Sequence, residues 1–204
     1  MLLLVFGCES TYYDAMEKIG VHKRDILIDR IEDAQSAQED GQEQFKDALT
    51  QFRAVVNFDG GELEDYYDEL NDEYEDSVSA AETIRDRVNA VESVAEALFD
   101  EWQEELEKYT NETLKRDSLR KLKDTQRRYN SLLNAMRKAE SKMAPVLSAL
   151  RDNVLYLKHN LNASAIGALQ GEFNGIKKEI NQLVSEMNKA IAESNSFISS
   201  MKSQ

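Results

Sequence analysis

A seven-residue repeat of apolar side chains runs through most of the chain and constrains its fold more than any other feature. Apolar or aromatic residues alternate at spacings of three and four over residues 27–55, 63–109, 119–161 and 166–201. This spacing places them along one seam of an α-helix, which such helices bury by packing seam to seam. The repeat therefore predicts an all-α protein made of long, heptad-patterned helices. In the third segment it falls at Leu119, Leu122, Gln126, Tyr129, Leu133, Met136, Glu140, Met143, Leu147, Leu150, Val154, Leu157 and Leu161.

Three short breaks divide the repeat into four segments of similar length. They lie around Gly60-Gly61 and in two runs of helix-capping residues, at 110–113 and 159–164. Short connections between helices imply antiparallel neighbours. We therefore predict an antiparallel four-helix coiled-coil bundle that forms a single domain over residues 9–204. Its helices are expected at about 11–56, 62–110, 114–160 and 163–202.

Two further expectations concern this architecture. An alternative to the bundle is an extended two-helix arm over residues 61–161 that buries its seams by dimerising. Pro145 lies inside the third predicted helix. Because proline has no amide hydrogen, it removes one backbone hydrogen bond there and predicts a kink.

The second and third segments carry opposite charge. Residues 60–110 contain 18 acidic and 3 basic residues, whereas residues 111–161 contain 12 basic and 5 acidic residues. Each exposed pair contributes only about 0–1 kcal/mol, but the summed asymmetry favours pairing these two helices as an antiparallel hairpin. The hairpin is predicted to set Lys115, Arg116, Arg120, Lys121, Lys123, Arg127 and Arg128 beside Glu92, Glu96, Asp100, Glu101, Glu104, Glu105 and Glu107.

The first eight residues resemble the end of a bacterial lipoprotein signal. An apolar run ends in Gly7-Cys8 and the sequence turns polar at once with Glu9. In such signals a small residue precedes a cysteine that is acylated and becomes the mature N-terminus. Cys8 is therefore the predicted lipidation site, and residues 1–8 the remnant of the signal. The run is short and has no positively charged region before it, so the alternative is a hydrophobic N-terminus with an ordinary cysteine.

The predicted anchor is a lipid alone. No other segment approaches the ~18 consecutive apolar residues that a membrane span requires. Glu9 follows the cysteine at the position where aspartate favours retention in the inner membrane. We therefore expect an anchor in a Gram-negative cell envelope that faces the periplasm, in the outer membrane rather than the inner.

Five segments resemble a known family, domain of unknown function 2959. They are YYDAMEK at 12–18, VHKRDIL at 21–27, VNFDGGEL at 56–63, LFDEW at 98–102 and LKHNLNA at 157–163. The resemblance spans nearly the whole chain. It implies a coiled-coil lipoprotein of Gram-negative, largely marine, bacteria, and it implies no activity or catalytic residue.

The net charge of −14 restricts the partners. The chain has no basic surplus with which to displace counterions from phosphates, so nucleic acid is not an expected partner. An anionic membrane surface would repel the body of the protein. The expected partners are the membrane through the N-terminal lipid, a further protein, or a second copy of the chain, and no small-molecule substrate or cofactor is expected.

The acidic stretch 59–76 offers an alternative function. It holds ten carboxylates and no base, so it could bind divalent cations, which accept clustered carboxylate oxygens, or a basic partner. Its apolar residues follow the helical seam rather than the ligand spacing of a calcium loop. We therefore expect a solvated helix face and no metal site.

No catalytic residues are predicted. His22 and His159 are the only histidines, and in an antiparallel bundle they fall at opposite ends. A phosphate-binding loop of the Gly-Lys-Ser/Thr type does not occur. Gly167, Gly171 and Gly175 repeat beside the last seam, where they allow either a close helix contact or a locally weakened helix. The sequence favours a non-enzyme: an envelope lipoprotein that acts as a coiled-coil spacer or protein-interaction scaffold.

Overall fold

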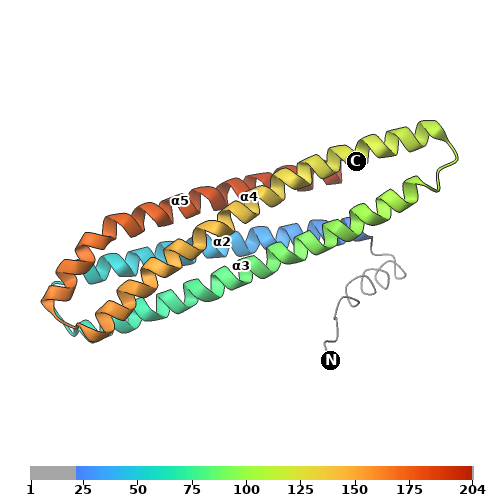
Figure 1. The fold of residues 1–204 in the computed structure, drawn as a ribbon. Coiled ribbons are helices and arrows are strands. Elements are labelled where there is room, and N and C mark those ends of the chain that lie inside the picture. Colours follow the sequence, from blue (N-terminus) through green and yellow to red (C-terminus); the bar gives the residue numbers. More distant parts are fainter. Residues whose placement is uncertain (1–21, 204) are drawn as a thin grey trace, which may run out of the picture.

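The structure, a computed structural model, describes residues 22–203, which form four long α-helices and no strand. The helices are α2 (Lys23–Val56), α3 (Leu63–Leu106), α4 (Glu112–His159) and α5 (Ala163–Lys202). The all-α prediction is confirmed (Figure 1). The second helix ends at Leu106 instead of 110 and the third begins at Glu112 instead of 114. Residues 11–21, predicted as the start of the first helix, lie outside the described residues.

The four helices form an antiparallel bundle in which chain neighbours are also neighbours in space. The main contacts join α2 to α3, α3 to α4, α4 to α5, and α5 back to α2 (Figure 1). The predicted four-helix bundle is therefore confirmed. At 1.5 Å per residue, the 48 residues of α4 make a rod about 70 Å long.

The turns form where the sequence breaks predicted them. Gly60 and Gly61 have φ values of 145° and 103°, which side chains disfavour, and they reverse the chain between α2 and α3. The side chain of Asn111 accepts hydrogen bonds from the amides of Thr113 (3.0 Å) and Leu114 (3.2 Å) at the start of α4. Asn162 caps α5 in the same way.

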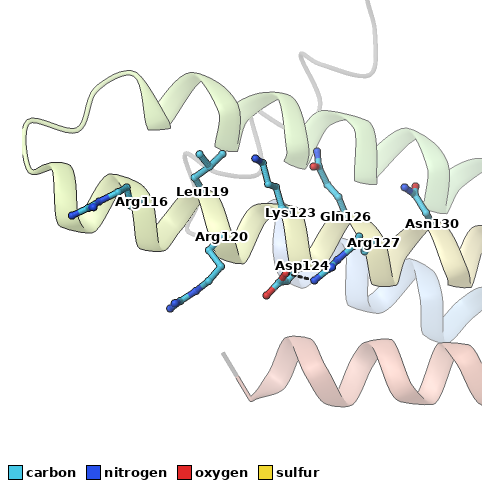
Figure 2. A pocket seen from close by; sticks show the side chains of 8 residues that line it. All are labelled: Arg116, Leu119, Arg120, Lys123, Asp124, Gln126, Arg127 and Asn130. Carbon is cyan, nitrogen blue, oxygen red and sulfur yellow. Dashed lines mark hydrogen bonds and ion pairs between the residues drawn. The ribbon is translucent and has the colours of Figure 1, made fainter.

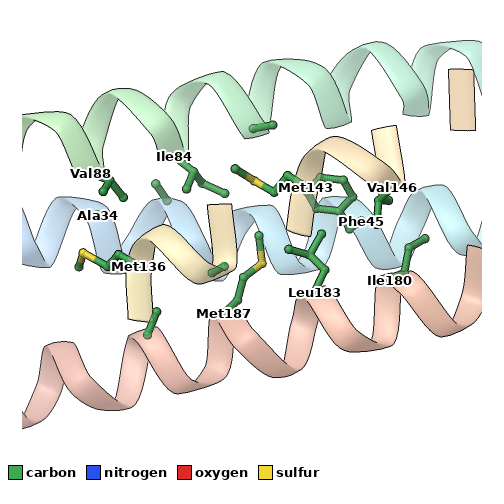
Figure 3. Close-up of a cluster of buried hydrophobic side chains, with 14 of the residues drawn as sticks. Ala34, Phe45, Ile84, Val88, Met136, Met143, Val146, Ile180, Leu183 and Met187 are labelled. Carbon is green, nitrogen blue, oxygen red and sulfur yellow. The ribbon is translucent and has the colours of Figure 1, made fainter. Parts of the chain in front are cut away.

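Side chains from all four helices meet in one continuous core. Figure 3 shows Phe45, Ile84, Met143 and Leu183, one from each helix, pointing into the same interior. Gly41 allows a close approach between α2 and α3, because an added Cβ would lie 2.6 Å from the Cδ1 atom of Ile84. The core thus follows the seams along the length of the bundle.

The seam predicted for α4 consists of two columns of residues, each with a spacing of seven, and the structure confirms one column. One column of the repeat, Leu122, Tyr129, Met136, Met143, Leu150 and Leu157, is buried as predicted. The other column is displaced by one residue: the structure buries Thr125, Leu132, Ala139, Val146 and Asn153, where the sequence suggested Gln126, Leu133, Glu140, Leu147 and Val154. Adjacent apolar pairs such as Leu132-Leu133 made both columns compatible with a heptad spacing. Val154 is buried in addition to Asn153.

Pro145 does not interrupt α4. The helix continues through it from Glu112 to His159, with Pro145 on the exposed side. Met143 and Val146 on either side of the proline are buried, so the helix keeps its packed seam there. The kink stays a prediction.

The α3–α4 hairpin projects beyond the other two helices at one end of the rod (Figure 1). The start of α2 and the end of α5 meet this hairpin at its base, where Arg24, Leu98, Trp102 and Met201 line one small hollow. We call the projecting part, residues 103–124, the arm. Leu106 and Leu122 are buried within it, and at its base the indole of Trp102 donates a hydrogen bond to Ser118 (2.8 Å). The arm is therefore a two-helix extension of the four-helix bundle.

Candidate interaction surface

The predicted lipidation site, Cys8, lies outside the described residues. It precedes the start of α2, at Lys23, by 15 residues in the sequence. That start lies at the arm end of the rod (Figure 1). Within residues 22–203, no helix combines the length and apolar character needed to span a membrane.

The two histidines lie at opposite ends of the rod, as predicted. His22 directly precedes α2 at the arm end, and His159 ends α4 at the far end. Both are exposed. They cannot belong to one catalytic or metal-binding constellation within a single copy of the chain.

The acidic stretch 59–76 forms the turn and the first helical turns of α3 at the far end of the rod. Two of its carboxylates contact α2: Gln44 donates a hydrogen bond to Glu73 (2.7 Å) and Gln51 to Glu69 (2.8 Å). Among residues 22–203, no group of three or more His, Cys, Asp or Glu side chains converges as metal ligands would. Binding of cations or of a basic partner by this stretch stays a prediction.

The three glycines of α5 make no close helix contact in the described part of the chain. A Cβ added to Gly167, Gly171 or Gly175 would have no heavy atom within 4 Å. They lie on an open side of α5, so they do not draw the helices of this bundle together.

The predicted pairing between the basic and acidic clusters of the hairpin is largely wrong. Within the described residues, only Lys115 of the basic cluster forms an ion pair with α3, to Glu107 (3.3 Å). Arg120 and Lys121 pair with Asp117, and Arg127 pairs with Asp124, all within α4. Acids one helical turn away are closer than those on the neighbouring helix. The prediction treated charge as a property of segments and did not consider the side of the helix on which each base lies.

The electrostatic contact between α3 and α4 instead centres on Arg137. Its guanidinium donates hydrogen bonds to Glu92 and Asn89 of α3 and to Glu140 of its own helix, and Glu140 also pairs with Arg85 (3.3 Å). Partial burial lowers the pKa of Arg137, but the hydrogen bonds to Glu140 and Glu92 outweigh this and raise the pKa above its usual value. This network joins the middle of the two helices.

Four bases in the arm or directly beside it form one row on the surface of α4. Arg116, Arg120, Lys123 and Arg127 follow a 4-3-4 spacing, which places them on one side of a helix. Together with Leu119 they line a groove of about 590 Å³. In Figure 2, Leu119 and Lys123 point towards α3, while Arg116 and Arg120 point away from it. We call these four bases the basic row.

Acids at the end of α3, including its C-cap residue Glu107, form a matching row beside it. Asp100, Glu104 and Glu107 follow a 4-3 spacing and are exposed. Glu104 and Glu107 line a second groove, of about 550 Å³, between α3 and α4. Both grooves are lined by Leu119, Lys123 and Gln126, so they adjoin on one face of the hairpin. We call the three acids the acidic row.

Large apolar side chains are exposed only at the two ends of the rod, as far as residues 22–203 show. Tyr109, Leu114 and Leu119 belong to the arm, and Leu155, Tyr156 and Leu161 lie at the turn between α4 and α5. Their exposed fractions range from 37% to 56%. Single exposed apolar residues are common on protein surfaces, but here the long sides of the rod are charged and the large exposed apolar residues lie at its two ends.

Sequence reasoning did not find the arm or the face that carries the two rows. The signal was weak: the heptad repeat predicts four segments of similar length and does not fix their relative stagger. The structure shows α3 and α4 with 44 and 48 residues against 34 for α2. This difference in length exposes the hairpin end.

Comparison with known families gives one match. The family described as a protein of unknown function (DUF2959) matches residues 12–201. This span includes almost all of the four helices and the complete arm. No curated protein and no solved structure matches the chain.

Proposed function

The chain belongs to the DUF2959 family, and we propose that it is a non-catalytic lipoprotein of a bacterial cell envelope that acts as a rigid spacer or protein-interaction scaffold. A lipid on Cys8 anchors it, and the rod faces the periplasm. The outer membrane is the preferred site of the anchor because Glu9, not aspartate, follows the cysteine.

The observation that carries this proposal is the distribution of apolar and charged surface along the rod. The six exposed large apolar residues named above lie at its two ends. The sides carry charges, which keep a long helix surface solvated and disfavour non-specific contact. A rod about 70 Å long with exposed apolar residues at both ends is suited to hold two partners, or a membrane and a partner, at a fixed separation.

The lipid anchor gives this rod a direction. Cys8 precedes α2 by 15 residues, and α2 begins at the arm end. A lipid on Cys8 would tether the arm end near the membrane and leave the far end, with Leu155, Tyr156 and Leu161, available to a protein partner. The dispersed histidines and the continuous apolar core support a mechanical role over a catalytic one.

Replacing Cys8 by serine tests the anchor. Cys8→Ser removes the thiol that would be acylated, so we expect the protein to move from the detergent-extracted membrane fraction to the soluble periplasmic fraction. Ser10→Ala, two residues further on, is the matched control and should leave the protein in the membrane fraction. Unchanged fractionation of Cys8→Ser would remove the lipoprotein proposal.

A further inference from the structure

We infer that the hairpin face around the arm joins two copies of this chain side by side, with the basic row of each copy facing the acidic row of the other. The inference rests on the rows themselves and holds whether or not the chain is lipidated.

The two rows are neighbours that leave each other largely unpaired within one chain. Lys115–Glu107 is the one ion pair that links the arm's bases to α3 in the described part of the molecule. Arg120 and Arg127 pair within α4 and keep 72% and 78% of their side-chain surface exposed, and Glu107 keeps 80%. Opposite charges therefore lie side by side on one face, directed at solvent.

Such a divided face is complementary to itself, so its partner is the same face of a second copy. Two identical faces pack around a two-fold axis that lies in the contact plane. If this axis runs across the rods, α3 lies on α3 and α4 on α4, so that like charges meet. If it runs along the rods, each α4 lies on the partner's α3, and each basic row meets an acidic row. Charge therefore selects the parallel pair.

The hairpin face contains two grooves into which side chains of a second copy can pack. The two adjoining grooves, about 590 and 550 Å³, share Leu119, which is 37% exposed. Side chains of the partner's rows can enter them and cover this leucine. Over their whole lengths α3 is acidic (16 acids and 2 bases) and α4 is basic (12 bases and 5 acids), which is the same sign as the two rows.

The parallel pair has two physical consequences. Both copies of α2 begin at the same end, so two anchors could enter one membrane, in agreement with the proposed function. The contact is built mainly from exposed charges, which salt screens over about 8–10 Å. Association should therefore weaken as ionic strength rises.

Exchanging the charges of the rows tests the inference. The experiment uses the full chain with Cys8→Ser, which removes the only thiol, and measures association by sedimentation equilibrium at low and high salt. One variant places two acids in the basic row (Arg120→Glu with Arg127→Glu) and another places two bases in the acidic row (Glu104→Lys with Glu107→Lys). The control, Arg151→Glu with Lys158→Glu, makes the same charge change as the first variant at the far end of α4. Circular dichroism checks that each variant keeps its helices, as expected for exposed positions.

We expect the parent chain to dimerise at low salt and each row variant to bind itself at least about tenfold more weakly, because each substituted position places like charges opposite one another in both contacts. The control should dimerise like the parent. An equimolar mixture of the two row variants should recover dimers, since the acids introduced in one variant face the bases introduced in the other, and the unchanged rows also face opposite charges. Recovery in the mixture is the result that a purely structural effect of the substitutions would not produce.

Three results would overturn the inference: a parent chain that is monomeric at low salt, row variants that dimerise like the parent, or a mixture that fails to recover. A fourth would redirect it. If the monomeric parent floats with phosphatidylglycerol vesicles but not with neutral phosphatidylcholine vesicles, and the basic-row variant does not, the basic row binds a membrane surface and not a second copy.

Discussion

Gln38 is the residue at which the core departs most clearly from the apolar repeat. It occupies a seam position of α2, is 0% exposed, and neither of its amide atoms has a hydrogen-bond partner among the described residues. A buried polar group without a partner costs about 1–3 kcal/mol. Polar residues at single seam positions can fix the register of packed helices at a cost in stability.

Replacing Gln38 by methionine should therefore stabilise the fold. Gln38→Met keeps the length and volume of the side chain and removes both unpaired atoms, so the free energy of unfolding should rise by about 1–2 kcal/mol. Urea unfolding followed by circular dichroism measures the change. The control is Gln42→Met, one turn further along α2, because Gln42 has a partner in Asn188 (3.3 Å) and its replacement should not stabilise. Equal effects at the two positions would contradict the assignment.

A second buried polar group lies near the base of the arm. The ring of Tyr129 packs against Phe99 and Phe197, with ring centroids 5.3 and 6.4 Å apart. Burial, with repulsion from Glu92 and Glu96, raises the pKa of its hydroxyl far above the usual value. Tyr129 therefore stays neutral over the physiological range and acts as core.

At the scale of the helices, the apolar repeat predicted much of the fold, whereas the net charge of the segments predicted the wrong ion pairs. Heptad spacing placed α5 from 163 to 202, as the structure has it, and found one of the two buried columns of α4. The second column could not be chosen from spacing alone, because adjacent residues such as Leu132 and Leu133 are both apolar. The pairing of α3 with α4 was right, but for the wrong residues, since Arg120, Lys121 and Arg127 pair with acids of α4 itself.

Arg137 should contribute more to the α3–α4 contact than Arg128, a base of the cluster at 115–128 that was predicted to face the acids of α3. Arg137→Met removes the hydrogen bonds to Glu92, Asn89 and Glu140 while keeping most of the apolar stem. Because the side chain is 34% exposed, solvent screening limits the loss, and we expect the free energy of unfolding to fall by only about 1 kcal/mol.

The matched change Arg128→Met tests whether this loss is specific. Arg128 is exposed and forms no ion pair within residues 22–203, so its replacement should change the free energy of unfolding by less than about 0.5 kcal/mol. Melting curves at low salt compare the two variants. A larger loss for Arg128→Met would restore the idea that the cluster at 115–128 holds the hairpin together.

At the scale of the whole molecule, the sequence predicted four antiparallel helices but not their stagger. The stagger depends on the turns and on how the seams of neighbouring helices pack together, so the sequence of one helix does not determine it. The stagger produces the arm, which is the only part of the described chain where two helices extend beyond the four-helix bundle. The candidate surface follows from that stagger, whereas the anchor at Cys8 depends on sequence alone.

The mass of the intact protein extracted from cell membranes tests the central claim most directly. If the chain is an anchored spacer, mass spectrometry should find a mature protein that begins at Cys8 and exceeds the mass of residues 8–204 by acyl groups attached to that cysteine. A chain that begins at Met1 and carries no lipid would contradict the account.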